Sequence, residues 1–324
     1  DCVVLGLGGL GSASLYAAAR QGWNTLGLEQ FGVVHDRGSS HGQTRIIRTA
    51  YFEHPDYVPL AQRSWDAWNA LQKESGEWLV QETGLLQVGP SEGEVVQGVL
   101  GSARQHDLPV EVLSPKELAD QYPALRANSE HVGVFEASAG FLRVETCVAS
   151  LLKLARQAGA QIQANTEVLS FSVNRQGLIS LETTRGKVET ERLMVTAGPW
   201  TQQVLADCDF HFDVIRKQQQ WFQIDRVDIK YENGFPCFLF ETEDGCFYGF
   251  PEIDRLGMKL AEHSGGQVVP DPSTLDRTVN RDDQSRCERF LDDHFHFTKR
   301  RLVHQSACMY TMSRSEEHTS ELQS

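Results

Sequence analysis

The sequence predicts an α/β fold in which a Rossmann-like dinucleotide-binding domain is joined to a second, α+β domain built on an antiparallel sheet. Three observations support this prediction. The chain has 324 residues, about twice the length of a common single domain. Its first residues read as strand, glycine turn and helix, and the segments 213–224 and 235–250 read as long strands of another sheet.

The N-terminal unit has the spacing of a dinucleotide-binding loop. The apolar run Val3–Leu5 precedes a GxGxxG motif formed by Gly6, Gly8 and Gly11, and a helix of small residues follows at 12–20. The first glycine permits the tight turn, the second lets the backbone approach a pyrophosphate, and the third lets the helix lie close to the strand. The helix N-terminus offers backbone N–H groups to the phosphates. The alternative is a glycine-rich turn that serves packing alone.

An acidic residue ends the next strand. The strand 25–28 is followed by Glu29, at the distance from the glycine motif where a carboxylate accepts a hydrogen bond from an adenosine ribose. A carboxylate at this place disfavours a 2′-phosphate. We therefore expect an adenine dinucleotide without that phosphate.

Arg45 and Arg48 lie three residues apart after a Gly/Ser stretch at 38–40. On a helix the two side chains would share a face. Two neighbouring guanidinium groups repel each other unless an anion lies between them, so the pair suggests a site for a carboxylate or phosphate. The alternative is a solvated helix face with ion pairs to Glu53 or Asp56.

The middle of the chain alternates helices and strands. A buried strand at 193–198 ends at a glycine turn, Gly198, and can bring the chain back beside the nucleotide. The other predicted elements are helices at 56–73, 92–106, 114–122 and 146–158, strands at 84–90, a strand–turn–strand unit at 132–141 and a β-rich stretch at 161–195.

Two cationic side chains lie close together in the segment 258–263. This segment is bounded by Gly257 and Gly265, and it is short enough to favour a strand over a helix. Lys259 and His263 would be neighbours in either structure, because they are separated by four residues. The alternative is a solvated strand face.

Composition excludes several classes of protein. The net charge is −14 and no basic block interrupts the acidity, so we expect no nucleic-acid partner. No apolar run reaches the roughly 18 residues that cross a bilayer, so we expect no membrane insertion. The seven cysteines are scattered without a CxxC pair, which is typical of a reducing compartment and gives no metal site.

Both ends of the sequence look incomplete. The chain begins directly on the first strand, so we expect a few residues to be missing before it. Residues 314–324 contain one apolar side chain and no periodicity, and they resemble the translation of a sequencing adapter.

Several motifs in a fixed order resemble the monomeric sarcosine oxidase and N-methyltryptophan oxidase family of FAD-dependent amine oxidases. The resemblance extends from Val3 to about Met312. Its motifs are the glycine loop, Ser-His-Gly-Gln-Thr-Arg-Ile-Ile-Arg at 40–48, Tyr-Val-Pro-Leu-Ala at 57–61, Tyr-Gly-Phe-Pro at 248–251, Lys-Leu-Ala-Glu-His at 259–263 and Ala-Cys-Met-Tyr-Thr at 307–311.

The resemblance implies two domains that are discontinuous in sequence. The FAD-binding domain would comprise 1–82, 144–208 and 303–312, with its C-terminal part missing. The substrate domain would comprise 83–143 and 209–302, and its sheet would cover the flavin. Residues 313–324 would form a non-native tail.

The resemblance also assigns roles to residues. Lys259 would lie beside the flavin at the place where the reduced flavin passes electrons to oxygen, because its ammonium can stabilise the charge of superoxide. His263, Arg45 and Tyr248 would complete the catalytic group. Arg48 would hold the substrate carboxylate and Tyr310 would line the substrate cavity. The cofactor-binding residues would be Gly6, Gly8, Gly11, Glu29, Thr44, Gly198 and Cys308, with Cys308 attaching the flavin covalently.

The expected activity is oxidation of a secondary N-methyl amino acid by FAD and oxygen, which gives an amino acid, formaldehyde and hydrogen peroxide. The surroundings of the substrate must lower the pKa of its amine, because a protonated amine cannot give up hydride. We expect a cytoplasmic monomer. The alternatives are a related oxidase or dehydrogenase of the pipecolate or glycine type, and an inactive, truncated nucleotide-binding fragment.

Overall fold

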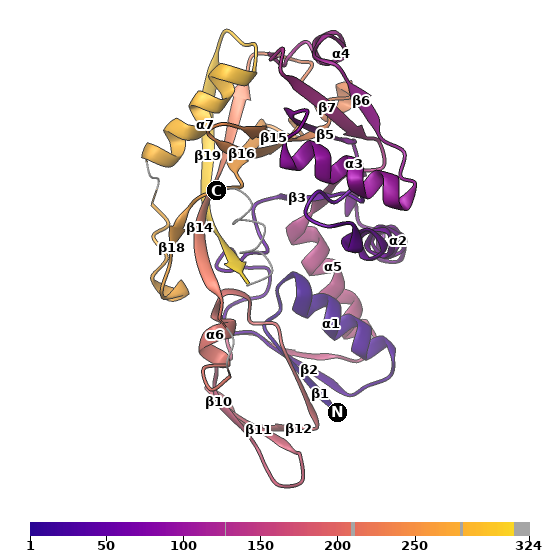
Figure 1. Cartoon of the computed structure of the whole chain (residues 1–324). Coiled ribbons are helices and arrows are strands. Elements are labelled where there is room, and N and C mark those ends of the chain that lie inside the picture. The colour runs from indigo at the N-terminus through magenta and orange to yellow at the C-terminus, as the bar shows by residue number, and fades with distance from the viewer. Residues whose placement is uncertain (127, 209–210, 279–280, 314–324) are drawn as a thin grey trace.

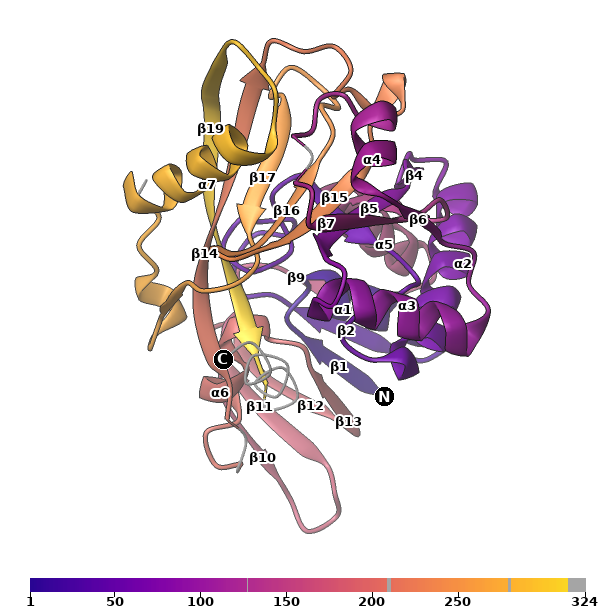
Figure 2. The same cartoon turned by 45° about the horizontal axis from the view of Figure 1, so that its top comes forward.

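The computed structural model describes residues 1–126, 128–208, 211–278 and 281–313. Within these residues the strands form four β-sheets, and the predicted α/β class is confirmed. Figure 1 shows a large sheet in the upper half of the molecule and a smaller parallel sheet with its helices in the lower half. The long strands β14 (Asp213–Ile224) and β19 (Arg300–Met312) run from the large sheet toward the parallel sheet (Figure 2).

The parallel sheet contains the predicted nucleotide unit. Its strand order is β13-β1-β2-β9, and all three pairings are parallel. The helices α1 and α5 pack on it through small and aliphatic side chains that include Leu15, Ala19 and Leu152. The elements are β1 (Cys2–Leu5), α1 (Gly9–Arg20), β2 (Thr25–Leu28), α5 (Val144–Gln157), β9 (Gln161–Gln163) and β13 (Arg192–Val195).

The strand predicted near 193–198 is present as β13 and ends beside the glycine loop, but it is partly exposed and not buried as expected. β13 pairs with β1 from Cys2 opposite Arg192 to Leu5 opposite Val195. The following turn carries Thr196, whose hydroxyl donates to the carbonyl oxygens of Leu5 and Gly6 at 2.9 and 2.8 Å. The end of β13 therefore lies directly beside the glycine loop.

The second sheet has nine strands in the order β18-β14-β17-β16-β15-β5-β7-β6, with β19 paired to β14. Its pairings are antiparallel, as predicted, except that β15 and β5 run parallel. Phenylalanines of β15, β16 and α7 form much of its core. The further elements are β5 (Leu85–Pro90), β6 (Glu111–Leu113), β7 (His131–Glu136), β15 (Cys237–Thr242), β16 (Gly245–Phe250), β17 (Met258–Glu262), β18 (Gln267–Val268) and α7 (Arg281–His294).

A third sheet corrects the prediction for Arg45 and Arg48. Residues Thr44–Ile47 form strand β3, in the order β3-β8-β4 with β8 (Gly140–Arg143) and β4 (Val80–Glu82), and not a helix. β-Branched residues such as Ile46 and Ile47 favour a strand, and β3 pairs with β8 along its whole length. The two arginines therefore do not share a helix face.

Most of the remaining elements agree with the predicted helices and strands to within a few residues. The remaining elements are α2 (Val58–Ser75), α3 (Glu94–His106), α4 (Pro115–Gln121), α6 (Thr201–Val204), β10 (Val168–Val173), β11 (Ile179–Thr183), β12 (Gly186–Thr190) and the 3₁₀ turns Pro55–Tyr57, Gly198–Trp200, Tyr231–Asn233 and Pro272–Thr274. The strands β10, β11 and β12 form a separate antiparallel sheet. The sequence did not predict α6, α7, β19 or the 3₁₀ turns.

Two sequence-based predictions are left as they were. The domain limits remain a prediction, and of the expected non-native tail only Ser313 lies within the described residues. In the part of the chain that the structure describes, no helix is long and apolar enough to span a membrane.

Candidate functional site

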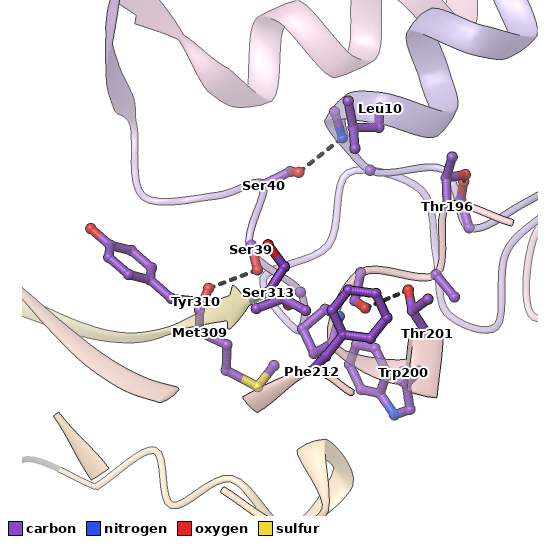
Figure 3. A pocket seen from close by; sticks show the side chains of 18 of the residues that line it. Leu10, Ser39, Ser40, Thr196, Trp200, Thr201, Phe212, Met309, Tyr310 and Ser313 are labelled. Atoms are coloured by element: carbon purple, nitrogen blue, oxygen red, sulfur yellow. Dashed lines mark hydrogen bonds between the residues drawn. The ribbon is translucent and has the colours of Figure 1, made fainter. Parts of the chain in front are cut away.

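A cavity of about 2070 Å³ connects the glycine loop with the nine-stranded sheet. Its wall includes Gly6, Glu29 and Thr196 from the parallel sheet, and His263 and Tyr310 from the larger one. Figure 3 shows Ser39 and Ser40 between the start of α1 at Leu10 and the end of β19 at Met309 and Tyr310. The Ser39 hydroxyl donates to the Met309 carbonyl oxygen at 2.7 Å, so the loop before β3 joins the two sides of the cavity.

The glycine loop has a geometry that only glycine allows. Gly6 has a φ of +87°, and a Cβ on Gly11 would lie 1.8 Å from the Gly6 carbonyl oxygen. Gly8 precedes helix α1 without a side-chain cap, so no side chain of that residue covers the helix N-terminus. Ser40 accepts a hydrogen bond from the Gly9 N–H at 2.8 Å. This cradle fits the pyrophosphate of a dinucleotide.

Glu29 lies in the cavity wall as an ionised carboxylate. Its oxygens accept hydrogen bonds from Leu7 N–H at 2.8 Å and Phe31 N–H at 3.0 Å, and His35 Nε2 is 3.3 Å away. Burial raises the pKa of Glu29, but the contacts with His35, Leu7 and Phe31 outweigh it and leave the pKa below its usual value. A carboxylate oxygen can accept more than one hydrogen bond, so a ribose hydroxyl can be added.

Arg45 lies on β3 and lines the cavity. Its guanidinium donates to the carbonyl oxygens of Ser39 and Thr44, the latter at 2.9 Å, and contacts Cys308 Sγ at 3.7 Å. Thr44 is fully buried and Cys308 is 1% exposed. The structure therefore brings Arg45, expected in the catalytic group, together with Thr44 and Cys308, which the resemblance assigned to the flavin.

Lys259 lies on β17 and is 1% exposed. Its ammonium donates to the carbonyl oxygens of Gly42 at 2.5 Å and Thr44 at 3.0 Å. The rings of Phe250 and Trp221 lie 4.9 and 5.3 Å from Nζ. The predicted strand is confirmed, but the contacts of Lys259 and His263 differ, because His263 faces Tyr310.

His263, Tyr310 and Tyr248 form an aromatic group next to Arg45 and Lys217. His263 Nδ1 lies 3.4 Å from the Tyr310 hydroxyl, and the rings of His263 and Tyr248 meet edge to face at 6.3 Å. Burial, assisted by the charge of Lys217, lowers the pKa of His263 to about 4. Burial also raises the pKa of both tyrosines. All three side chains are therefore neutral near pH 7.

Arg48 is engaged by a carboxylate of this chain. Its Nη2 lies 2.5 Å from Glu53 Oε1, and the guanidinium lies over the rings of Tyr51 and Phe52 at 4.3 and 4.7 Å. Glu53 lines the cavity and its second oxygen has no hydrogen-bond partner among the described residues. The ion pair that the sequence left as an alternative is thus present, though on a strand end instead of a helix.

Three polar residues of the site escaped the sequence analysis. Lys217 of β14 lines the cavity and donates to the carbonyl oxygens of His263, Ser264 and Gly265. Glu145 of α5 and Glu136 of β7 accept hydrogen bonds from the backbone before and after β3. Lys217 could have been noticed in the sequence, because it lies within a polar run of a predicted strand. No local sequence pattern marks Glu145 or Glu136.

The remaining cysteines and acids form no further centre. All seven cysteines are free. Among the described residues no group of three or more histidine, cysteine or acidic side chains could hold a metal ion.

Comparison with known proteins gives one consistent family. Residues 1–320 match the family model described as FAD dependent oxidoreductase. The chain is 36% identical to a monomeric sarcosine oxidase of Streptomyces avermitilis, over 98% of this chain and 83% of the relative. It is 35% identical to an N-methyl-L-tryptophan oxidase of Yersinia pestis, over 83% and 71%. The solved structure of NikD, an unusual amino acid oxidase, has the same fold, with a TM-score of 0.85, 21% identity and coverage of 98% and 83%.

Proposed function

Because this chain belongs to the FAD-dependent oxidoreductase family, alongside monomeric sarcosine oxidases and N-methyl-L-tryptophan oxidases, we propose that it oxidises the N-methyl group of a secondary amino acid. The amine and oxygen, with one water, give the primary amino acid, formaldehyde and hydrogen peroxide. The observation that supports this most is the continuous cavity, which joins a dinucleotide cradle to a neutral aromatic group beside cationic side chains.

Residues of the parallel sheet and of the loop before β3 would hold FAD. The cradle of Gly6, Gly8 and Gly11 would receive the pyrophosphate, and Glu29 would accept from the ribose. Gly198, which lines the cavity, and the buried Thr44, whose carbonyl oxygen accepts from Arg45 and Lys259, would complete this set. When bound, FAD supplies the two-electron acceptor that the amino-acid side chains lack.

Cys308 is the proposed site of covalent attachment. Its thiol is buried, and its Sγ lies 3.7 Å from the Arg45 guanidinium. We expect the yellow colour of the holoenzyme to stay with the polypeptide after acid precipitation. In Cys308→Ser it should move to the supernatant, whereas the exposed Cys208 can be changed to Ser without this effect. Complete release from the wild type would contradict covalent attachment.

Arg48 is the proposed partner of the substrate carboxylate. A planar guanidinium can bind a carboxylate through two parallel hydrogen bonds. Glu53 occupies one side of Arg48, so the substrate carboxylate would either exchange with Glu53 or share the guanidinium with it. Tyr310, which lines the cavity, would form the wall around the N-methyl group, and Tyr248 contacts Tyr310 there.

The charges around this wall fit an amine that must lose its proton. Lys217 and Arg45 are cations that line the cavity, and nearby positive charge lowers the pKa of an ammonium group. Lys259, buried behind Gly42 and Thr44, would supply fixed positive charge where oxygen gains electrons. We further propose that the protein works as a cytoplasmic monomer, and its seven free cysteines suit a reducing compartment.

The decisive experiment is a substrate survey with purified holoenzyme of the full chain. Sarcosine and N-methyl-L-tryptophan are compared with glycine and pipecolate by measuring peroxide and formaldehyde in the same samples. Equal amounts of both products from an N-methyl amino acid would support the proposal. Peroxide without formaldehyde would indicate a different amine. Substrate-dependent dye reduction without peroxide would indicate a dehydrogenase.

A further inference from the structure

The turn before β3 has an unusual backbone. Gly42 has a φ of +91° and Gln43, which is not a glycine, has a φ of +72°. A side chain in this region is strained unless its surroundings hold it there. The side chain of Gln43 is held at both ends, because its oxygen accepts from Trp221 Nε1 at 2.8 Å and its nitrogen donates to Asp254 at 2.6 Å.

The backbone of this turn is held by Glu145, in the first turn of α5. One carboxylate oxygen accepts from Gly42 N–H at 2.7 Å, and both oxygens accept from Gln43 N–H at 3.1 and 3.2 Å. Glu145 lies more than a hundred residues from this turn in sequence. The strained turn therefore depends on a charge from another element.

The same turn binds Lys259 from its other side. Lys259 Nζ donates to the carbonyl oxygen of Gly42 at 2.5 Å, and this carbonyl belongs to the peptide group whose N–H is that of Gln43. One peptide group thus has a lysine ammonium on its oxygen and a glutamate carboxylate on its N–H. Hydrogen bonds in such a chain polarise and strengthen each other.

Among the described residues no carboxylate contacts the ammonium group of Lys259 directly. Its further acceptors are the carbonyl and hydroxyl oxygens of Thr44, at 3.0 and 3.4 Å, and no ion pair of Lys259 occurs among the described residues. Three acceptors match the three N–H bonds of an ammonium group.

The charged and titratable groups around Lys259 come from four elements. Burial lowers the pKa of Lys259 most, and the positive charge of Arg45 on β3 lowers it further. Cys308 on β19, Glu145 on α5 and Cys237 on β15 act in the opposite direction. Glu145 is the one carboxylate in this set.

We propose that Glu145 is a positioning residue for Lys259 and its counter-charge, acting through the Gly42–Gln43 peptide group. The carboxylate fixes the carbonyl that receives the ammonium and favours its charged form, while no anion touches the ammonium itself. Glu145 thus opposes the effect of burial and of Arg45 on the charge of Lys259, and it does so without touching the ammonium. We call the chain from Glu145 through the Gly42–Gln43 peptide group to Lys259 the relay. A role of the relay in oxygen reduction rests on the proposed function, whereas the existence of the relay does not.

The test measures the ionisation of Lys259 in the holoenzyme. Lysine labelled with ¹³C at Cε gives eight signals, one for each lysine of the sequence, and the signal of Lys259 is the one lost in Lys259→Met. Glu145→Gln keeps the acceptor oxygen and the shape but removes the charge. It should lower the titration midpoint of Lys259 by on the order of one pH unit. Glu145→Asp, which keeps the charge, should restore most of that shift.

The matched control is Glu241→Gln. Glu241 also accepts from two backbone N–H groups, those of Glu94 and Val95 at 3.1 and 2.9 Å, and it should leave the midpoint of Lys259 unchanged. An unchanged midpoint in Glu145→Gln, or an equal shift in both variants, would overturn the proposal.

A second measurement changes Lys259 instead of Glu145 and follows the amide proton of Gln43. In Lys259→Met the amide proton of Gln43 should move upfield, because the peptide group loses its polarising cation, while that of Val95 stays in place. An unmoved Gln43 signal overturns the proposal. If both shifts occur but no N-methyl amino acid is oxidised, the proposed function fails and the relay stands.

Discussion

Arg48 combines an ion pair with contacts to two aromatic rings, and this combination makes a specific prediction. Arg48→Lys replaces a planar donor of two hydrogen bonds by a point charge. We expect kcat/KM for N-methyl amino acids to fall tenfold or more, which corresponds to about 1.4 kcal/mol, with little change in FAD content. Arg226→Lys, at a partly exposed pair with Asp228, is the control. Unchanged kinetics in Arg48→Lys would mean that the carboxylate binds elsewhere.

Lys259 is expected to act on one half of the reaction only. Lys259→Met removes a fixed charge near the place where oxygen is reduced, and losing such a contact costs about 3 kcal/mol, or on the order of a hundredfold in rate. Stopped-flow mixing separates the anaerobic reaction with amine from the reaction of reduced enzyme with oxygen. Lys230→Met, a lysine paired with Glu252, should affect neither. Equal slowing of both halves would show that Lys259 supports the architecture instead.

At the scale of elements, the turn that leads into β3 is the most constrained short segment of the site. A Cβ on Gly42 would lie 1.8 Å from Gln219 Oε1, and the φ of Gly42 is +91°. Gly76, after α2, has a φ of +70° with no atom within 4 Å of a Cβ. Gly76→Ala should therefore cost about 1 kcal/mol and Gly42→Ala about 1–3 kcal/mol more. Urea unfolding of both variants checks this, and equal losses would show that Gln219 moves aside easily.

The elements also show how far sequence reasoning extends. The glycine loop, the position of Glu29 after β2 and the long strand β14 were predictable because each has a local pattern of glycines or apolar residues, whereas β19 was not predicted. The pattern of Arg45 and Arg48 was misread, since a spacing of three residues has meaning only after the helix is established. Glu145 could not be found, because its role depends on packing α5 against a distant turn. Glu53 was one of two candidate partners that the sequence offered, and the geometry at the end of β3 pairs it with Arg48.

For the whole molecule, buried histidines predict how stability changes with pH. Burial lowers the pKa of His41 and His263 to about 4, below the unfolded value of about 6.5. Between about pH 6.5 and 4 these two histidines are protonated in the unfolded chain but neutral in the folded one. Their contribution to the free energy of unfolding is therefore complete above about pH 6.5 and is lost as the pH falls toward 4. The slope is about 1.4 kcal/mol per pH unit for each histidine.

This slope can be measured by urea unfolding between pH 7 and 4.5. His263→Gln should flatten it by about half relative to the wild type, if the two histidines dominate this range. His54→Gln, at an exposed histidine, should leave the slope as it is. A wild-type stability that does not change over this range would contradict the burial of both imidazoles in the neutral form.

The pairing of β14 with β19 limits how early the nine-stranded sheet can fold during synthesis. Asp213 lies opposite Met312 and Ile224 opposite Arg300, so one side of β14 has no partner until residues 300–312 have left the ribosome. Contacts between such distant segments form slowly, and an unpaired strand edge invites association with other chains. Cys308 and Tyr310 lie on β19. The site is therefore assembled only after residues 300–312 have been synthesised, and a nascent chain that stalls before them exposes the edge of the nine-stranded sheet.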